Sequence, residues 1–112
     1  MRQRPADADR RRRPRFQVDE ACTVTVRGRA QAGRAVNLSI GGAMLAGLDG
    51  LDAGERGTLR LERPGAEVGF EVRSRDADAV HVRFLETDPL LPAFQQAVAR
   101  LTSGLPSASS AA

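Results

Sequence analysis

Six short stretches of the chain are rich in β-forming residues, and most of them alternate hydrophobic with polar positions. In one stretch Val80, Val82 and Phe84 share a face, and in another Leu59 and Leu61 do so. Alternation with a period of two is the pattern of a strand with one buried face. The pattern therefore predicts strands over residues 21–28, 31–39, 40–47, 56–64, 67–76 and 79–86.

The hydrophobic period changes after the sixth of these strands. Four apolar residues then recur at the spacing of a helix: Leu91, Phe94, Val98 and Leu101. Asp88 precedes them as a candidate N-cap, and Pro89 follows it near the first turn, where proline is tolerated. The spacing predicts one helix within residues 87–101.

The order of these elements, six strands and then one helix, predicts the fold class. We expect an all-β domain, a six-stranded antiparallel β-barrel capped by a C-terminal helix. The folded domain is expected over residues 10–101. Residues 1–9 and 102–112 are polar, small or broken by proline, so we expect a disordered arm and a disordered tail there.

The basic residues are concentrated at one end of the chain. All 17 are arginine, and the formal net charge is +3. Residues 1–16 hold seven arginines and two aspartates, a net charge of +5, so the remaining residues carry −2. A mildly acidic body with a basic arm indicates an anionic partner for the arm, not a protein that coats nucleic acid with its whole surface.

The sequence also excludes or disfavours several classes of protein. Cys22 is the only cysteine, which excludes an internal disulfide and a cysteine-based zinc site. No apolar run approaches the ~20 residues of a transmembrane helix, and no apolar segment follows the arginine-rich N-terminus as in a secretory signal. We therefore expect no membrane insertion and a cytoplasmic protein.

The titratable residues make no convincing active site. The single histidine, His81, lies inside an alternating strand pattern, where a structural or solvent-facing role is expected. Cys22 has no evident histidine partner, and the acidic residues are too scattered for a metal site or a general-acid pair. We expect no catalytic residue, no metal and no cofactor, and hence a protein that is not an enzyme.

The run RRRRPRF, residues 10–16, is the first stretch with binding chemistry. Arginine offers five donors in a planar fork that matches phosphate oxygens and the O6/N7 edge of guanine, and its plane can stack on a base. The alternative is a solvated run of charge.

The second stretch is NLSIGG, residues 37–42. Asn37 and Ser39 are two positions apart at the end of a strand, so their side chains should point the same way. Gly41 and Gly42 allow positive φ and let a ligand approach the backbone closely. The alternative is an ordinary polar turn.

The two stretches carry short motifs that stand in order along the chain. Arg11 and Arg15 form an RxxxR motif, and Asn37, Ser39 and Gly42 form a [D/N]xSxxG motif that begins 22 positions after Arg15. In this order and at this spacing, the sequence resembles the PilZ domain, the bacterial receptor domain for cyclic di-GMP.

The resemblance covers roughly residues 10–101 and implies a ligand bound on the outer surface of the barrel. The arginines would contact phosphate and guanine, and NLSIGG would form the opposing wall. The arm would then act as a flexible clamp over a small bis-guanine ligand. The residues implied to bind cyclic di-GMP are Arg10, Arg11, Arg12, Arg15, Asn37, Ser39, Gly41 and Gly42.

Three positions modify this picture. Asn37 stands in place of aspartate and offers one carbonyl acceptor and a donor amide. His81 stands where the family often has glycine. Arg10 directly precedes RxxxR, at the position that influences ligand number in the family, and a second guanidinium plane there implies two ligand molecules per chain.

The implied function is a cyclic di-GMP receptor whose arm changes conformation on binding and so regulates a downstream protein partner. Two alternatives remain. One is a PilZ-like adaptor that does not bind the nucleotide and works through protein contacts. The other is a basic-armed β-barrel that binds RNA or DNA, but the body is net negative and lacks the stacking aromatic residues that such barrels present.

Overall fold

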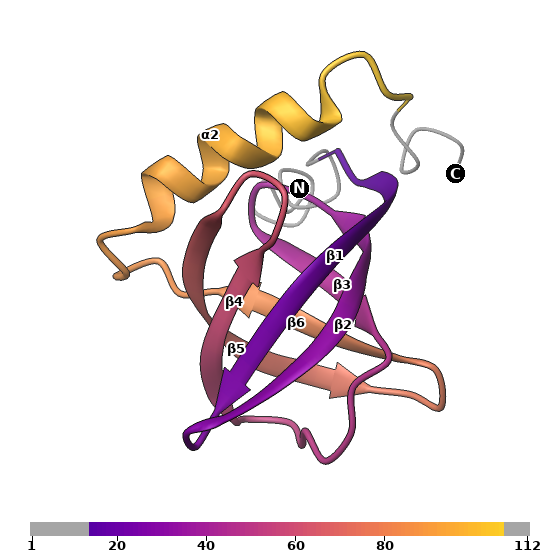
Figure 1. Cartoon of the computed structure of the whole chain (residues 1–112), viewed down its shortest axis with the longest axis vertical. Coiled ribbons are helices and arrows are strands. Elements are labelled where there is room, and N and C mark those ends of the chain that lie inside the picture. Colours follow the sequence, from indigo (N-terminus) through magenta and orange to yellow (C-terminus); the bar gives the residue numbers. More distant parts are fainter. Residues whose placement is uncertain (1–13, 107–112) are drawn as a thin grey trace, which may run out of the picture.

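The computed structural model describes residues 14–106, and six strands form a closed antiparallel barrel with one helix across an end (Figure 1). Around the barrel the strands follow the order β1-β2-β3-β6-β5-β4. This arrangement confirms the predicted fold class. The elements are β1 Phe16–Val26, β2 Arg29–Leu38, β3 Gly42–Ala46, β4 Arg56–Leu61, β5 Ala66–Arg75, β6 Ala79–Phe84 and α2 Leu91–Thr102.

The alternating residues of the strands fill the barrel. Leu59 and Leu61 of β4 are fully buried, and Val80, Val82 and Phe84 of β6 are nearly so. The faces predicted for these two strands are therefore confirmed. Burial of apolar surface is the main favourable term in folding, so these inward faces hold the barrel together.

Helix α2 covers one end of the barrel with its apolar face (Figure 1). Phe94 and Val98 are fully buried, and the ring of Phe94 meets that of Phe84 edge to face, with 4.9 Å between ring centroids. Leu91 and Leu101 are partly buried against the same core. The helical spacing in the sequence thus predicted the correct face.

The start of the helix differs from the prediction, because Asp88 is not its N-cap. The N-cap is Leu90, and Pro92, not Pro89, lies in the first turn. The Asp88 carboxylate accepts hydrogen bonds from the backbone N–H of Leu90, at 2.9 Å, and from that of Gly69 in β5. Asp88 therefore fastens the preceding turn to the barrel, and the helix begins after that turn.

The helix ends at Thr102, one residue past its predicted end. Thr102 is buried, and its hydroxyl donates to the carbonyl of Val98 at 2.8 Å. The first residue assigned to the predicted tail thus belongs to the helix. The predicted arm over residues 1–9 and the tail from residue 107 onward lie outside the described residues.

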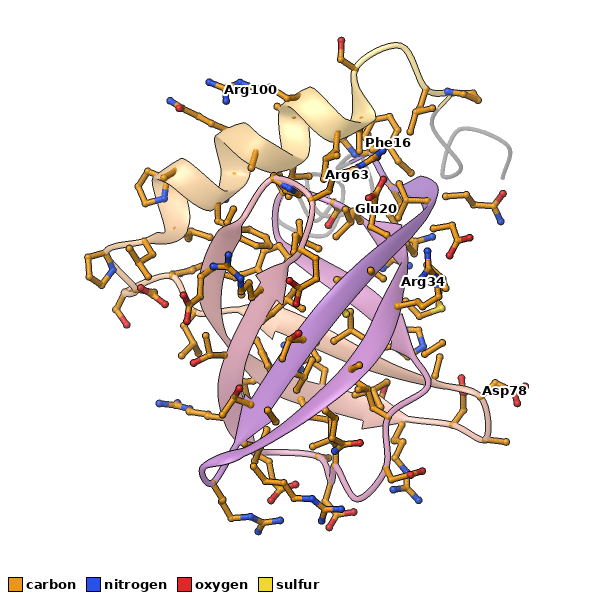
Figure 2. The ribbon with its side chains drawn as sticks, in the orientation of Figure 1. Phe16, Glu20, Arg34, Arg63, Asp78 and Arg100 are labelled. Carbon is orange, nitrogen blue, oxygen red and sulfur yellow. The ribbon has the colours of Figure 1, made fainter. Side chains whose placement is uncertain are left out.

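Strand β1 begins at Phe16, five residues before its predicted start. Its first residues continue the antiparallel pairing with the end of β2, where Phe16 lies opposite Leu38. Two carboxylates interrupt the apolar alternation here, which hides this part of the strand in the sequence. Both are paired with arginines of other segments. Asp19 pairs with Arg34, and Glu20 pairs with Arg63 at 2.7 Å (Figure 2).

Candidate functional site

A cavity of about 270 Å³ on the outer face of the barrel gathers the described part of both motifs. It lies over the ends of β2 and β3 and the adjoining parts of β5 and β6. The predicted residues that line it are Arg15, Asn37, Ser39, Gly41 and Gly42. Arg10, Arg11 and Arg12 lie outside the described residues.

The pairing of β1 with β2 brings the two motifs together. Arg15 directly precedes β1, and Gln17 lies opposite Asn37 in the register. The chain reverses between them at a hairpin turn, where Arg27 and Gly28 both have positive φ. The end of the RxxxR motif therefore lies beside the start of the [D/N]xSxxG motif, although they are far apart in sequence.

Ser39 organises the turn that follows β2. Its hydroxyl oxygen accepts hydrogen bonds from the N–H groups of Gly41, at 3.2 Å, and Gly42, at 3.1 Å. Its own backbone N–H donates to the carbonyl of Gly42 at 2.9 Å. Asn37 and Ser39 both line the cavity while Leu38 between them is fully buried, so the predicted common direction of their side chains is confirmed.

Gly42 serves close strand packing in this turn. Neither Gly41 nor Gly42 belongs to the positive-φ residues of the described chain, so the turn does not use the positive φ that glycine allows. A Cβ on Gly42 would lie only 2.4 Å from the carbonyl oxygen of Val82, because β3 passes close to β6 there. The carbonyl of Gly41 accepts a hydrogen bond from the N–H of Phe84 at 3.0 Å. Residues 40 and 41 thus form a turn, and β3 is shorter than predicted.

The helix also holds this turn. The side-chain amide of Gln95 in α2 donates to the carbonyl of Ile40 at 2.7 Å, and the Ile40 side chain remains 44% exposed. This contact joins segments 55 residues apart in sequence. Sequence reasoning missed Gln95, because nothing in a helical pattern indicates which exposed side chain meets a distant turn.

Arg73 of β5 is a second residue that sequence reasoning missed. The pairing of β5 with β6 is regular up to Val72 opposite Val82 and resumes at Ser74 opposite His81, so Arg73 is the extra residue of a β-bulge. A bulge redirects a side chain that simple alternation would place elsewhere. Arg73 is directed to the cavity wall in this way.

His81 forms part of the same wall, opposite Met44 of β3. Its side chain is 34% exposed, and Nε2 lies 3.7 Å from a carboxylate oxygen of Asp76. The N–H groups of Asp78 and Ala79 donate to the other oxygen of Asp76. These bonds and, to a smaller extent, the nearby His81 hold the pKa of Asp76 below its usual range, so the carboxylate stays charged beside the cavity.

Three arginines are the charged residues in the described lining of the cavity: Arg15, Arg73 and Arg83. Arg83 is partly compensated, because its guanidinium donates to the carboxylate of Glu71 at 3.1 Å. Cationic side chains therefore predominate over anionic ones in the described lining of the cavity. Such a surface suits a ligand that carries negative charge and several hydrogen-bond acceptors.

Three further observations concern the described part of the chain outside this cavity. Between residues 14 and 106, no group of three or more His, Cys, Asp or Glu side chains is placed to hold a metal ion. Cys22 points into the barrel at 1% exposure, and burial raises the pKa of its thiol to about 11. In the same residues, no helix has the length and apolar character needed to cross a membrane.

Comparison with protein families identifies a matching family. A family model described as the PilZ domain matches residues 9–102, which is most of the chain. This range includes both motifs, all six strands and the helix. No curated protein matches the sequence.

Two solved structures share the fold. The inhibitor of motility MotI/DgrA of Bacillus subtilis is 20% identical, with a TM-score of 0.62 over 83% of this chain and 51% of that one. The PlzA protein of Borreliella burgdorferi, crystallised in complex with c-di-GMP, is 15% identical, with a TM-score of 0.60 over 80% of this chain and 41% of that one. The chain spans about half the length of these proteins or less, and at these identities the likeness concerns the fold alone.

Proposed function

This chain belongs to the PilZ domain family, and from that premise we propose that its outer cavity binds cyclic di-GMP. The observation that carries the proposal is the convergence of Arg15 with Asn37, Ser39 and the two glycines around one basic cavity. These residues are the described part of both family motifs. The protein would be a receptor without catalytic activity, acting in the cytoplasm.

The chemistry of the cavity supports this ligand. Cyclic di-GMP carries two phosphates and two guanines, so it presents negative charge and acceptor edges together. The forks of Arg15 and Arg73 suit either group. The Asn37 side chain can accept one hydrogen bond from the Watson–Crick edge of a guanine through its carbonyl oxygen. Because the chain has no tryptophan or tyrosine, arginine would also supply the stacking surface.

The arginine run supplies the second half of the proposed site. Arg10, Arg11 and Arg12 come shortly before Arg15, which already lines the cavity. We propose that this segment folds over the bound ligand, with Arg10 holding a second ligand molecule. The change in the arm would then be read by a downstream protein partner.

Titration calorimetry tests the proposed function. We expect cyclic di-GMP to bind with a Kd in the micromolar range or tighter, about −8 kcal/mol, and GTP, cyclic GMP and a single-stranded oligonucleotide to bind far more weakly. Arg15→Ala should cost on the order of 1.5–3 kcal/mol, the value of a lost charge-assisted contact. Arg29→Ala, at the opposite end of β2 from Asn37, is the matched control. A folded protein that gives no heat with cyclic di-GMP would overturn the proposal.

A further inference from the structure

His81 places an imidazole in the cavity wall, the one imidazole among the described lining residues. It is the only histidine of the chain, and histidine is the residue that ordinarily gains or loses its proton between pH 5 and 8. Its imidazole lies in the wall with Arg73 and Arg83, 34% exposed, so a ligand and water can both reach it. The described lining therefore combines one imidazole with the guanidinium groups of Arg15, Arg73 and Arg83.

The side chains that face His81 from the surrounding strands include neutral, cationic and acidic groups. Met44 on β3 and Ser74 on β5 lie opposite it and are neutral. Arg15, Arg73 and Arg83 remain cationic throughout this pH range. The acidic group at hand is Asp76, whose free carboxylate oxygen is 3.7 Å from Nε2, while Glu71 is engaged by Arg83.

We propose that His81 binds the anionic ligand in its protonated form, so that binding is coupled to the uptake of a proton. The inference rests on the proposed binding of cyclic di-GMP. A neutral imidazole has one N–H donor, and the protonated ring has two. In the unliganded protein, one donor can face Asp76. Protonation supplies a second, charged donor for a phosphate or guanine acceptor.

The proton balance of the step is simple. One proton passes from water or buffer to the ring nitrogen that lacks one, and no covalent bond of the ligand changes. The phosphodiesters of the ligand are anionic throughout this pH range, so they neither supply nor take up the proton. On release of the ligand, the imidazole returns the proton to the solvent.

Calorimetry with cyclic di-GMP at pH 5 and pH 8 tests the inference on the whole 112-residue chain. We expect affinity about fivefold to tenfold higher at pH 5, the factor gained when a neutral hydrogen bond becomes charge-assisted. Repeating the titration near neutral pH in two buffers of different ionisation enthalpy should reveal uptake of a fraction of a proton per ligand. His81→Gln, which keeps a polar side chain of similar length, should bind equally at both pH values and take up no proton.

Two further measurements separate the possible outcomes. Arg29→Gln removes a charge at the far end of β2 and should keep the pH dependence of the wild type. NMR of the single imidazole should show a larger protonated fraction at neutral pH with ligand than without. If His81→Gln keeps the full pH dependence, or the imidazole signal ignores the ligand, the inference is wrong while ligand binding stands. If no ligand binds at either pH, the proposed function itself fails.

Discussion

Gly42 shows at the scale of one residue how the barrel and the turn at residues 40 and 41 depend on each other. The absence of a side chain lets β3 approach the carbonyl of Val82, and the N–H of Gly42 donates to the Ser39 hydroxyl. The same residue thus allows close strand packing and fixes one side of the turn. A methyl group at this position would disturb both.

We expect Gly42→Ala to lower the free energy of unfolding by about 1–3 kcal/mol, because the added methyl group overpacks the β3–β6 contact. It should also weaken binding of cyclic di-GMP, since β3 and the turn must shift together. Gly57→Ala is the matched control. Its Cβ would lie 2.4 Å from the carbonyl of Thr25, but β4 does not contribute to the cavity.

Urea unfolding and calorimetry on both variants provide the test. Both should lose stability, and only Gly42→Ala should lose affinity. Equal affinity of the two variants would mean that the position of the turn does not govern binding.

At the scale of elements, a hydrogen bond from Gln95 of α2 to the carbonyl of Ile40 joins the helix to the turn at residues 40 and 41. The helix is anchored independently by Phe94 and Val98 in the barrel end. Gln95 can therefore position the turn without carrying the helix itself.

We expect Gln95→Ala to weaken binding of cyclic di-GMP about threefold, within the 0.5–1.5 kcal/mol net contribution of a single hydrogen bond. The turn would lose one of the groups that hold it in the binding conformation. Gln96→Ala changes the same residue type at the adjacent exposed position and should leave affinity unchanged. Calorimetry on the two variants distinguishes a positioning role from a general effect on the helix, which both substitutions would share.

The elements also show how far the sequence could predict the structure. Alternation predicted the inward faces of β4 and β6 because each strand buries one face in the barrel. It missed the first residues of β1, because Asp19 and Glu20 are satisfied by arginines that only the fold brings near.

The residues of the candidate site likewise fall into those that the sequence could predict and those that it could not. Arg15, Asn37, Ser39 and the glycines stand in local motifs, so their positions could be predicted from spacing. Arg73 reaches the cavity through a bulge, and Gln95 through a contact across the molecule. Neither the bulge nor the distant contact leaves a pattern in the neighbouring sequence from which it could be predicted. His81 was assigned to a strand correctly, but its place in the cavity wall depends on which strands are neighbours.

For the molecule as a whole, the barrel and α2 share one core, and Phe94 lies at their junction against Phe84. We expect Phe94→Ala to reduce the free energy of unfolding by about 3–5 kcal/mol, because it leaves a cavity where the helix meets the barrel. Leu90→Ala, at a side chain that is 50% exposed, should cost far less.

Urea unfolding of these variants should be followed by circular dichroism, since the chain has no tryptophan or tyrosine to report by fluorescence. The helix and strand signals should change together in one transition. A helix signal lost well before the strand signal would show that α2 and the barrel are separate folding units.

The buried thiol of Cys22 makes opening of the barrel measurable by chemical labelling. The thiolate is the form that attacks alkylating reagents, and burial keeps this thiol both protonated and out of reach. Because it is the only cysteine of the chain, any thiol modification must occur there. The rate of labelling therefore reports how often the barrel opens, without the need to introduce a cysteine by mutation. Any stabilisation of the barrel by a ligand can be read from the slowing of that single reaction.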